Sequence, residues 1–209
     1  MKETLVSRAT LGRLPLYLEY LQSLPDIENK NISATMIAKG LGLGEVQVRK
    51  DLGSVVGTGK PKVGYVITEL IKKLEKVLGR NDIQSAVIVG AGKLGRALLD
   101  YDGFGAYGLE VVAAFDNAME RCGTSVSNKK IYPVEQFAAF CKDNDVKIGI
   151  IAVPQSAAQT VCDMMIKNNI TAIWSFSPTS LDVPENVILQ QENLALSLAH
   201  LKIQMNENR

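Results

Sequence analysis

The stretch Ser85-Ala-Val-Ile-Val-Gly-Ala-Gly-Lys-Leu-Gly-Arg96 decides the fold of the larger part of this chain. A short β-branched run meets glycines at positions 90, 92 and 95, and an apolar helical pattern follows. This order of strand, glycine turn and helix is typical of a site for a dinucleotide phosphate. Gly90 allows a tight turn, Gly92 lets backbone N–H groups approach the pyrophosphate, and Gly95 lets the helix pack on the strand. A lone G-x-G-x-x-G is weak evidence, so the surrounding sequence has to support it.

A second strand and an acidic residue follow the glycine turn. The residues 109–115 read as a strand, and Asp116 ends it, about 20 residues after the last glycine. A carboxylate there accepts hydrogen bonds from the adenosine ribose hydroxyls and repels a 2′-phosphate, which favours NAD(H) over NADP(H). Arg121 lies near enough in the sequence to temper that preference. The alternative is that Asp116 only caps a turn.

Strand and helix alternate through the rest of this half, which predicts an α/β fold with a doubly wound parallel sheet. Pro133 is expected to begin a helix, followed by a strand over 147–153, a helix over 155–167 and a strand over 171–176. Ligands bind at the carboxyl ends of parallel strands, although the prolines there could simply mark loop starts. The candidate nucleotide contacts are Gly90, Ala91, Gly92, Lys93, Leu94, Gly95, Asp116, Ala152, Val153, Pro154, Phe176, Ser177 and Pro178.

Residues 1–80 read as a small helical domain. Leucines at steps of three and four predict an amphipathic helix over 10–24, with Pro15 either starting it or distorting its first turn. Ser33 is a good N-cap for a helix over 34–39, and a third helix over 45–52 follows a glycine-containing turn. Met36 and Val46 are expected to face the core. This helix-turn-helix arrangement places its second helix in the major groove of DNA.

Polar and basic side chains on the third helix favour contact with DNA. Gln47, Arg49 and Lys50 offer donors to base edges and phosphates. The Gly-rich, basic stretch that follows reads as a β wing, from which Lys60 and Lys62 can reach backbone phosphates. The alternative is a helical domain with an ordinary solvated basic face.

The net charge of +1 hides a difference between the two halves. Residues 1–80 hold 13 Lys and Arg against 8 Asp and Glu, a net of +5, whereas residues 81–209 hold 10 against 14, a net of −4. The first half is therefore the half suited to a polyanion.

The three cysteines, Cys122, Cys141 and Cys162, have no C-x-x-C spacing, and we expect buried, reduced thiols.

Charged residues interrupt any signal peptide, and no apolar run approaches the roughly 20 residues of a membrane helix. We expect a cytoplasmic protein.

An enzyme should also present an acid, a base or a nucleophile near the nicotinamide. The chain has one histidine, His200, within a predicted C-terminal helix, and neither a catalytic constellation nor a metal-ligand cluster is visible in the sequence. The nucleotide fold also leaves no room for a substrate domain. These features favour a sensor without catalytic residues. The alternatives are a small NAD-dependent oxidoreductase and a module that binds CoA or another adenine nucleotide.

Together these features resemble the Rex family of redox-sensing transcriptional repressors. The resemblance implies a winged helix-turn-helix domain over 1–80, a Rossmann-like domain over 81–190, and a helix over 191–209 that swaps onto the partner in a homodimer. It also implies that the NAD⁺-bound or free protein binds operator DNA, and that binding of NADH makes the protein dissociate from the DNA. Tyr101 matches a family tyrosine near the nicotinamide. The motifs that carry the resemblance are Arg13-Leu-Pro-Leu-Tyr-Leu18, Gln47-Val-Arg-Lys-Asp-Leu52, Val63-Gly-Tyr65, Gly90-Ala-Gly-Lys-Leu-Gly95, Asp100-Tyr-Asp-Gly-Phe104, Phe115-Asp116, Ala152-Val-Pro154 and Phe176-Ser-Pro178.

Four places depart from the family pattern, one of which is the wing, where Ser54-Val-Val56 replaces the usual aromatic. Glu19 stands where an Arg is common in the opening helix, and Asn193 stands where an Asp is common before the last helix. The charged pair that would link those two segments is therefore absent. Lys93 replaces an Asn of the glycine loop and could meet a phosphate. The departures bear on the strength and the sign of the response to NADH.

Overall fold

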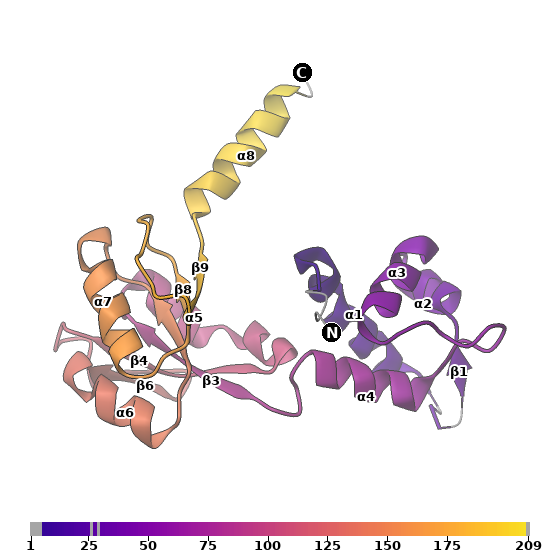
Figure 1. Ribbon diagram of the computed structural model, residues 1–209, viewed down its shortest axis with the longest axis horizontal. Helices are drawn as coiled ribbons and strands as arrows, with labels where there is room; N and C mark the ends of the chain where they lie inside the picture. Colours follow the sequence, from indigo (N-terminus) through magenta and orange to yellow (C-terminus); the bar gives the residue numbers. More distant parts are fainter. Residues whose placement is uncertain (1–5, 26, 29, 208–209) are drawn as a thin grey trace. The chain divides into compact units, whose positions relative to one another are not determined.

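The computed structural model describes residues 6–25, 27–28 and 30–207. The chain divides into two compact units (Figure 1). Unit 1 comprises Met1–Ile83 and Gly105–Gly108, and unit 2 comprises Gln84–Phe104 and Leu109–Arg209. Each unit has its own buried apolar core.

Unit 1 consists of four helices and a two-stranded sheet that the sequence did not predict. Its first helix begins at Arg8, because the Ser7 hydroxyl caps it by accepting a hydrogen bond from the Thr10 N–H over 3.1 Å. Pro15 therefore lies inside the helix and neither starts it nor marks its first turn. The elements are α1 (Arg8–Ser23), β1 (Asn31–Ile32), α2 (Ala34–Leu41), α3 (Glu45–Val55), β2 (Tyr65–Val66) and α4 (Ile67–Val77), with β1 antiparallel to β2.

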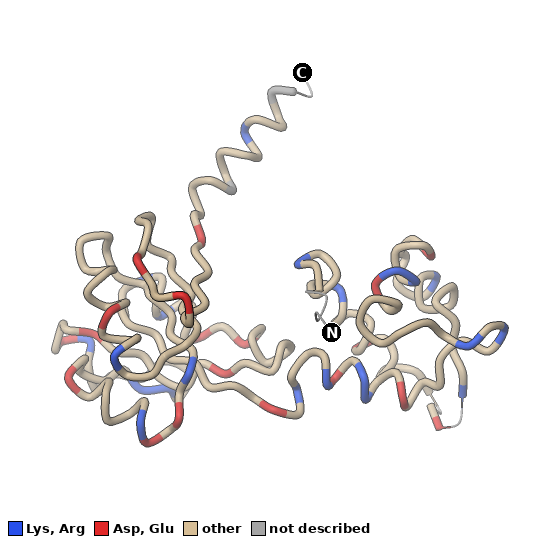
Figure 2. The backbone as a smooth tube through the Cα atoms, viewed as in Figure 1, with Lys and Arg blue, Asp and Glu red and all other residues tan. Residues whose placement is uncertain are grey.

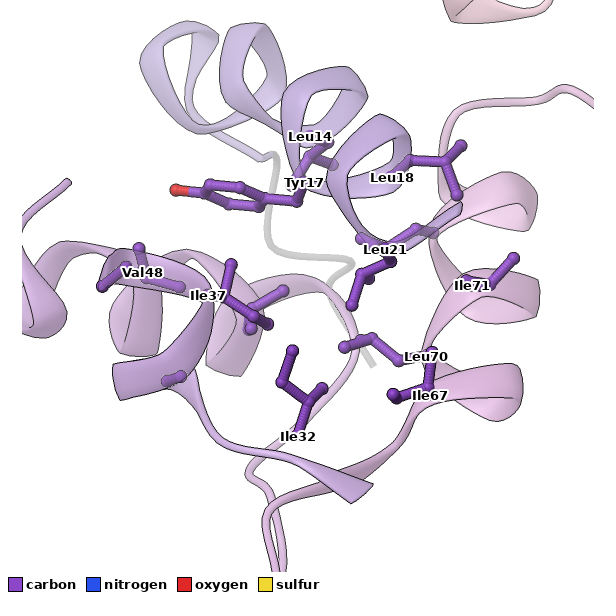
Figure 3. Packing of buried hydrophobic residues seen from close by; sticks show 14 of the residues in the cluster. Leu14, Tyr17, Leu18, Leu21, Ile32, Ile37, Val48, Ile67, Leu70 and Ile71 are labelled. Carbon is purple, nitrogen blue, oxygen red and sulfur yellow. The ribbon is translucent and has the colours of Figure 1, made fainter. Parts of the chain in front are cut away.

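Helical spacing decides which side chains enter the core of unit 1 (Figure 3). On α3, Val48 and Leu52 are fully buried, so Val46 points the other way and is 64% exposed. On α2, Ile37 is buried and its neighbour Met36 is 56% exposed. The expectation that Met36 and Val46 face the core is therefore wrong, since each lies on the face of its helix opposite the buried positions.

Unit 2 is a seven-stranded sheet of order β5-β6-β4-β3-β7-β8-β9. Six of these strands are mutually parallel, and β5 pairs antiparallel with β6 at the edge. The buried apolar side chains form two clusters, which is the arrangement of a doubly wound sheet covered on both faces. The elements are β3 (Gln84–Val89), α5 (Lys93–Asp100), β4 (Leu109–Asp116), β5 (Ser125–Val126), β6 (Lys129–Pro133), α6 (Phe137–Asp143), β7 (Ile148–Ile151), α7 (Gln155–Lys167), β8 (Ala172–Ser175), β9 (Ile188–Gln191) and α8 (Leu194–Glu207), with 3₁₀ turns at Asp102–Tyr107 and Val134–Gln136.

Pro133 does not begin a helix, contrary to the sequence prediction. It is the last residue of β6, where it pairs in register with Asp116 of β4, and a 3₁₀ turn separates it from α6. A proline lacks an N–H for the ladder and is tolerated at a strand end, so the pattern that indicated a helix start also fits a strand end.

The last helix, α8, leaves its apolar side chains exposed. Before the helix, the Asn193 side-chain oxygen accepts a hydrogen bond from the Leu196 N–H over 3.1 Å and so caps the helix start. No described helix is both long enough and apolar enough to cross a membrane. The exposed apolar residues of α8 are Leu194, Leu196, Leu198, Leu201, Ile203 and Met205.

Candidate dinucleotide site and nucleic-acid interface

Gly90 turns the chain sharply at the end of β3. Its φ of 102° lies in the region that favours glycine, and a Cβ atom there would lie 2.5 Å from the Ala152 carbonyl oxygen. The Gly90 N–H donates to the Phe115 carbonyl over 2.8 Å, and the Ala152 N–H donates to the Val89 carbonyl over 2.9 Å. The turn is therefore fixed between the ends of the two neighbouring strands.

The other two glycines have different surroundings. A Cβ atom on Gly95 would lie 1.8 Å from the Gly90 carbonyl oxygen, so Gly95 is needed for the packing of α5 on the turn. A Cβ atom on Gly92 would meet nothing within 4 Å, and no side chain caps the start of α5 there. Open space at a helix N-terminus without a capping side chain suits an anionic phosphate, and Lys93 and Leu94 are exposed beside it.

The carboxyl ends of β7 and β8 continue this edge of the sheet. The structure places Ala152, Val153 and Pro154 directly after β7, and the Phe176 N–H donates to the last residue of β7, Ile151, over 3.0 Å. Ser177 follows β8, and its hydroxyl is buried with no hydrogen-bond partner among the described residues. A buried hydroxyl without a partner is costly, so its position at the ligand-binding edge fits a group that a bound molecule would satisfy.

A row of aromatic rings lies near this edge, and the sequence predicted a nucleotide contact only for the rings at its two ends, Tyr101 and Phe176. Tyr101, which is 57% exposed, meets the Phe104 ring edge-on with centroids 5.0 Å apart. Phe104 meets Trp174 at 6.1 Å, and Trp174 meets Phe176 at 4.4 Å. The single tryptophan of the chain is thus in contact with Phe176, one of the candidate nucleotide contacts.

Asp116 lies at the end of β4, where the ribose-binding acid was predicted, but its carboxylate already has protein partners. One oxygen accepts from the Ala91 N–H at 2.6 Å and from the Arg121 guanidinium at 3.1 Å, and the other accepts from the Ala118 N–H at 2.8 Å. Burial works against the charged form, but these donors outweigh it and hold the pKa of Asp116 below its usual range. Asp116 therefore makes the contacts of a turn cap, which was the alternative to binding the ribose.

Three exposed polar side chains and an exposed apolar one lie together on α3. Gln47, Arg49 and Lys50 are exposed as predicted, and the Arg49 guanidinium pairs with the Glu45 carboxylate one turn earlier. Val46 joins them on the surface, a position from which a side chain can contact a thymine methyl group. Figure 2 shows Lys and Arg along α3 and in the loop that follows it.

That loop is a short wing. Lys60 and Gly64 form an antiparallel bridge closed by two hydrogen bonds of 2.8 Å, and Lys62 adopts a positive φ of 62° at the tip. Between the wing, Arg49 and the start of α2 lies a hollow of about 340 Å³. Lys60, Lys62 and Arg49 all line it, so it presents positive charge of the kind that meets a DNA phosphate.

Asp51 is a residue whose role sequence reasoning missed. It is 4% exposed, and the Tyr17 hydroxyl (2.6 Å), the Arg13 Nε (2.7 Å) and the Thr10 hydroxyl (3.0 Å) all donate to its carboxylate. The three donors belong to α1, so Asp51 ties α1 to α3. The signal in the sequence is that Asp51 lies three residues after the buried Val48, on the core-facing side of α3.

The same group of side chains reaches the exposed side of α3. The Gln47 amide, turned so that its oxygen faces the guanidinium, accepts from Arg13 at 3.0 Å. Burial raises the pKa of Tyr17 to about 12, and its hydrogen bond to Asp51 adds to the shift. Burial opposes the charged form of Asp51, yet Arg13, Tyr17 and Thr10 outweigh it and lower the pKa of this carboxyl.

Two of the three cysteines are buried as expected, Cys141 on α6 and Cys162 on α7, whereas Cys122 is only half-buried, so the expectation of a buried thiol is wrong for it. Cys141 and Cys162 are buried and free, and burial raises the pKa of each to about 11. Both thiols therefore stay protonated and unreactive near neutral pH. No cluster of three or more His, Cys, Asp or Glu that could hold a metal ion occurs among the residues placed in the structure.

The fold and these sites define a class: a winged-helix DNA-binding domain joined to a Rossmann-like nucleotide-binding domain. Residues 5–53 match the family described as "Putative DNA-binding protein N-terminus", and residues 81–179 match the family described as "CoA binding domain". The chain belongs to the Rex family of redox-sensing transcriptional repressors, as its similarity to curated relatives shows.

These relatives match nearly the whole chain. Redox-sensing transcriptional repressor Rex of Pelotomaculum thermopropionicum is 39% identical over 95% of this chain and 93% of its own length. The repressors of the same name from Bacteroides thetaiotaomicron and Treponema denticola are 38% and 36% identical, covering 97% and 100% of this chain and 91% and 99% of their own lengths. The names of these relatives are those of transcriptional repressors, which agrees with the prediction of a regulator rather than an enzyme.

Solved structures agree with this assignment. The crystal structure of RSP in complex with β-NAD⁺ and operator DNA matches with a TM-score of 0.80 and 34% identity, over 98% of this chain and 94% of that one. The structure of RSP in complex with β-NADH matches with a TM-score of 0.72 and 34% identity, over 98% and 96% of the two chains. The predicted fold, a winged helix-turn-helix followed by a Rossmann-like parallel sheet, is confirmed.

Proposed function

We propose that this repressor binds operator DNA through α3 and the wing, binds NAD(H) at the glycine turn, and loses affinity for DNA when the cofactor is NADH. The observation that carries the proposal is that one chain holds two features: a basic surface on α3 and the wing, and an open, uncapped start of α5 that suits a phosphate, here called the phosphate cradle. The structural relatives whose titles name NAD⁺ with operator DNA and NADH support the choice of ligands.

The two proposed DNA-binding surfaces, α3 and the wing, would make different contacts with DNA. Gln47, Arg49 and Lys50 are the candidates for base-edge contacts, since they lie exposed on the helix that corresponds to a recognition helix. Lys60 and Lys62 are the candidates for phosphate contacts from the wing, which set position and affinity without reading sequence.

On the nucleotide side, the residues of the cradle fit a dinucleotide. The start of α5 at Gly92 and Lys93 would hold the pyrophosphate, and the unpartnered Ser177 hydroxyl would bind a polar group at the end of β8. Tyr101 would lie near the nicotinamide end, as the family resemblance implies. In this proposal NAD(H) takes part in no reaction. The affinity of the protein for DNA depends on the oxidation state of the bound cofactor.

The exposed apolar side chains of α8 support a homodimer. Six large apolar side chains exposed on one helix need a partner surface, and a second copy of this chain is the partner that the family implies. We therefore assign residues 1–80 to DNA binding, 81–190 to NAD(H) binding and 191–209 to dimerisation. A cytoplasmic location follows from the proposed partner, because bacterial operator DNA lies in the cytoplasm.

The response to NADH is a shift between two states of the dimer. NADH must bind the DNA-released state better than the DNA-bound state, and only this difference in affinity moves the equilibrium. Glu19 is exposed on α1 and Asn193 caps α8, so neither supplies the Arg–Asp pair common in the family. We propose that NADH binding and DNA binding are coupled in this chain without that Arg–Asp pair.

Two measurements on the full chain test the proposal. Calorimetry should show binding of NADH and none of CoA, since the structural relatives whose titles name a nucleotide hold NAD⁺ and NADH. Arg49→Ala should weaken operator binding by about 1–3 kcal/mol if Arg49 contacts a guanine. Lys142→Ala, at the exposed end of α6, should leave operator binding unchanged. Binding of CoA in place of NADH would contradict the nucleotide assignment, and full operator affinity in Arg49→Ala would contradict the role of α3.

A further inference from the structure

The side-chain amide of Gln47 can face the Arg13 guanidinium in only one orientation. With its N–H₂ group toward Arg13, donors would meet donors. With its oxygen there, the amide accepts hydrogen bonds from Nε and Nη1 of Arg13, each over 3.0 Å. A carbonyl oxygen has two lone pairs, so these two donors use its acceptor capacity. The Gln47 amide therefore has only its two N–H donors left for another molecule.

Asp51 holds the Arg13 guanidinium in place from inside unit 1. Nε and Nη2 of Arg13 donate to the two carboxylate oxygens over 2.7 and 2.9 Å, the bidentate arrangement of a strong ion pair. The hydroxyls of Thr10 and Tyr17 supply two further donors, which completes the roughly four hydrogen bonds that a carboxylate accepts. Because Asp51 is buried, a departure of Arg13 would leave an unpaired charge in the core. We therefore expect the guanidinium to keep its position when DNA binds.

Gln47 is the exposed end of this series of hydrogen bonds, and Asp51 is the buried end. The two residues are four positions apart on α3 and so lie on the same side of the helix, where Arg13 of α1 contacts both. The N–H₂ group of Gln47 thus belongs to the same exposed surface as Arg49 and Lys50. All three side chains offer only hydrogen-bond donors to a molecule that meets this surface.

The pattern of donors and acceptors in the major groove decides which base such a glutamine can bind. Glutamine usually pairs with adenine through both amide atoms, since its oxygen accepts from N6 and its nitrogen donates to N7. Gln47 cannot form this pair, because its oxygen is already occupied by Arg13. Guanine presents two acceptors, N7 and O6, in the major groove, and these suit a group that can only donate.

We propose that Arg13 is a positioning residue that makes Gln47 a donor only, and that Gln47 therefore selects guanine over adenine at the base that it contacts. Arg13 acts through the amide and contacts no base itself. The inference rests on the proposed function, because it requires α3 to lie in the major groove of the operator. It adds to that function the chemistry by which one side chain distinguishes two purines.

Selection of bound duplexes from a pool of random sequence, followed by sequencing, tests the inference on the full chain without NADH. Gln47→Met keeps the length of the side chain and removes the amide, so the base position that loses its preference is the one that Gln47 contacts. At that position the parent chain should favour guanine over adenine about tenfold, as expected for one well-placed base contact.

Arg13→Lys should move this preference toward adenine. The lysine ammonium keeps a positive charge beside Asp51 but lacks the planar fork that reaches the amide as well, so the Gln47 oxygen becomes free to accept from adenine N6. The ratio of guanine to adenine should fall at least about fivefold at the Gln47 position and stay the same at the other positions.

Thr10→Val is the matched control, because it alters the same group of side chains without releasing the amide. It removes a donor to Asp51 and should lower the melting temperature. Arg13 still occupies the Gln47 oxygen in this variant, so the ratio of guanine to adenine should change less than about twofold. The control separates a change in stability from a change in base selection.

Four results would overturn the inference. A preference for adenine at the Gln47 position would show that the amide oxygen is free, and an unchanged selection in Gln47→Met would show that this side chain contacts no base. An unchanged ratio in Arg13→Lys would show that Arg13 does not control the amide. Equal shifts in Arg13→Lys and Thr10→Val would show that the buried group only places the helix. These results leave the proposed function intact, whereas a parent chain that binds no duplex would contradict both.

Discussion

Asp51 shows at the scale of a single residue how α3, the proposed recognition helix, is held. A buried carboxylate is costly unless it is paired and hydrogen-bonded. Here Tyr17, Arg13 and Thr10 of α1 satisfy it, and Arg13 also contacts Gln47 on the exposed side of α3. A change in this buried group therefore changes both the stability of unit 1 and the position of a predicted DNA-contacting side chain.

Removal of one donor to Asp51 should destabilise the N-terminal unit. We expect Tyr17→Phe to lower the free energy of unfolding by about 1.5–3 kcal/mol, because a hydrogen bond to a buried charge is lost and the ring remains. Chemical denaturation measures this difference. Tyr20→Phe in the same helix is the matched control, since the Tyr20 ring is only partly buried against the core. Equal stability of the two variants would show that the Tyr17 hydroxyl contributes nothing.

The raised pKa of Tyr17 predicts a loss of stability at alkaline pH. In the folded chain this pKa rises from 10.0 to about 12, chiefly through burial. A group with a raised pKa stabilises the fold fully below its unfolded pKa, and this contribution disappears as the pH rises through the folded value. Stability should therefore fall between pH 10 and about 12, and less steeply in Tyr17→Phe. Parallel pH curves for the parent and the variant would contradict this explanation.

The glycine turn between β3 and α5 can be tested at the scale of one element. Gly95→Ala would place a Cβ atom 1.8 Å from the Gly90 carbonyl oxygen, so it should prevent α5 from packing and lower the melting temperature sharply. Gly92→Ala meets nothing within 4 Å at an ordinary φ of −70°, so it should leave the melting temperature unchanged. NADH binding to Gly92→Ala should nevertheless weaken, because a methyl group would occupy the position that the pyrophosphate approaches. Full NADH affinity in this variant would place the phosphates elsewhere.

Sequence reasoning was most successful where a local pattern has a single physical solution. The glycine spacing predicted the turn, and the helix over 155–167 was predicted with the bounds that the structure gives. It was least successful where the decisive partner is distant in sequence. Nothing local shows that Asp51 meets Tyr17, or that the carboxylate of Asp116 is already bound by the backbone of Ala91 and by Arg121. Pro133 was misread because a strand end and a helix start make the same demand on a proline.

At the scale of the whole molecule, α8 is a helix whose described side chains are all exposed in the single chain. Leu198 is 68% exposed on it. If α8 packs on a second copy, Leu198→Glu should weaken the dimer by about 2 kcal/mol or more, because an apolar contact is lost and a charge is buried. Lys202→Glu also adds negative charge to this helix but leaves its apolar side chains intact, and it should dimerise normally. Sedimentation equilibrium gives both constants, and an unchanged dimer in Leu198→Glu would assign the contact to another surface.

The coupling between the two units is the central claim, and one titration tests it most directly. The affinity of the full chain for an operator duplex is measured at a fixed total concentration of NAD⁺ and NADH while their ratio is varied. We predict that the affinity falls at least about tenfold as NADH replaces NAD⁺, within the range typical of allosteric coupling. An affinity that stays the same at every ratio would contradict the account, even if the protein binds both nucleotides and DNA.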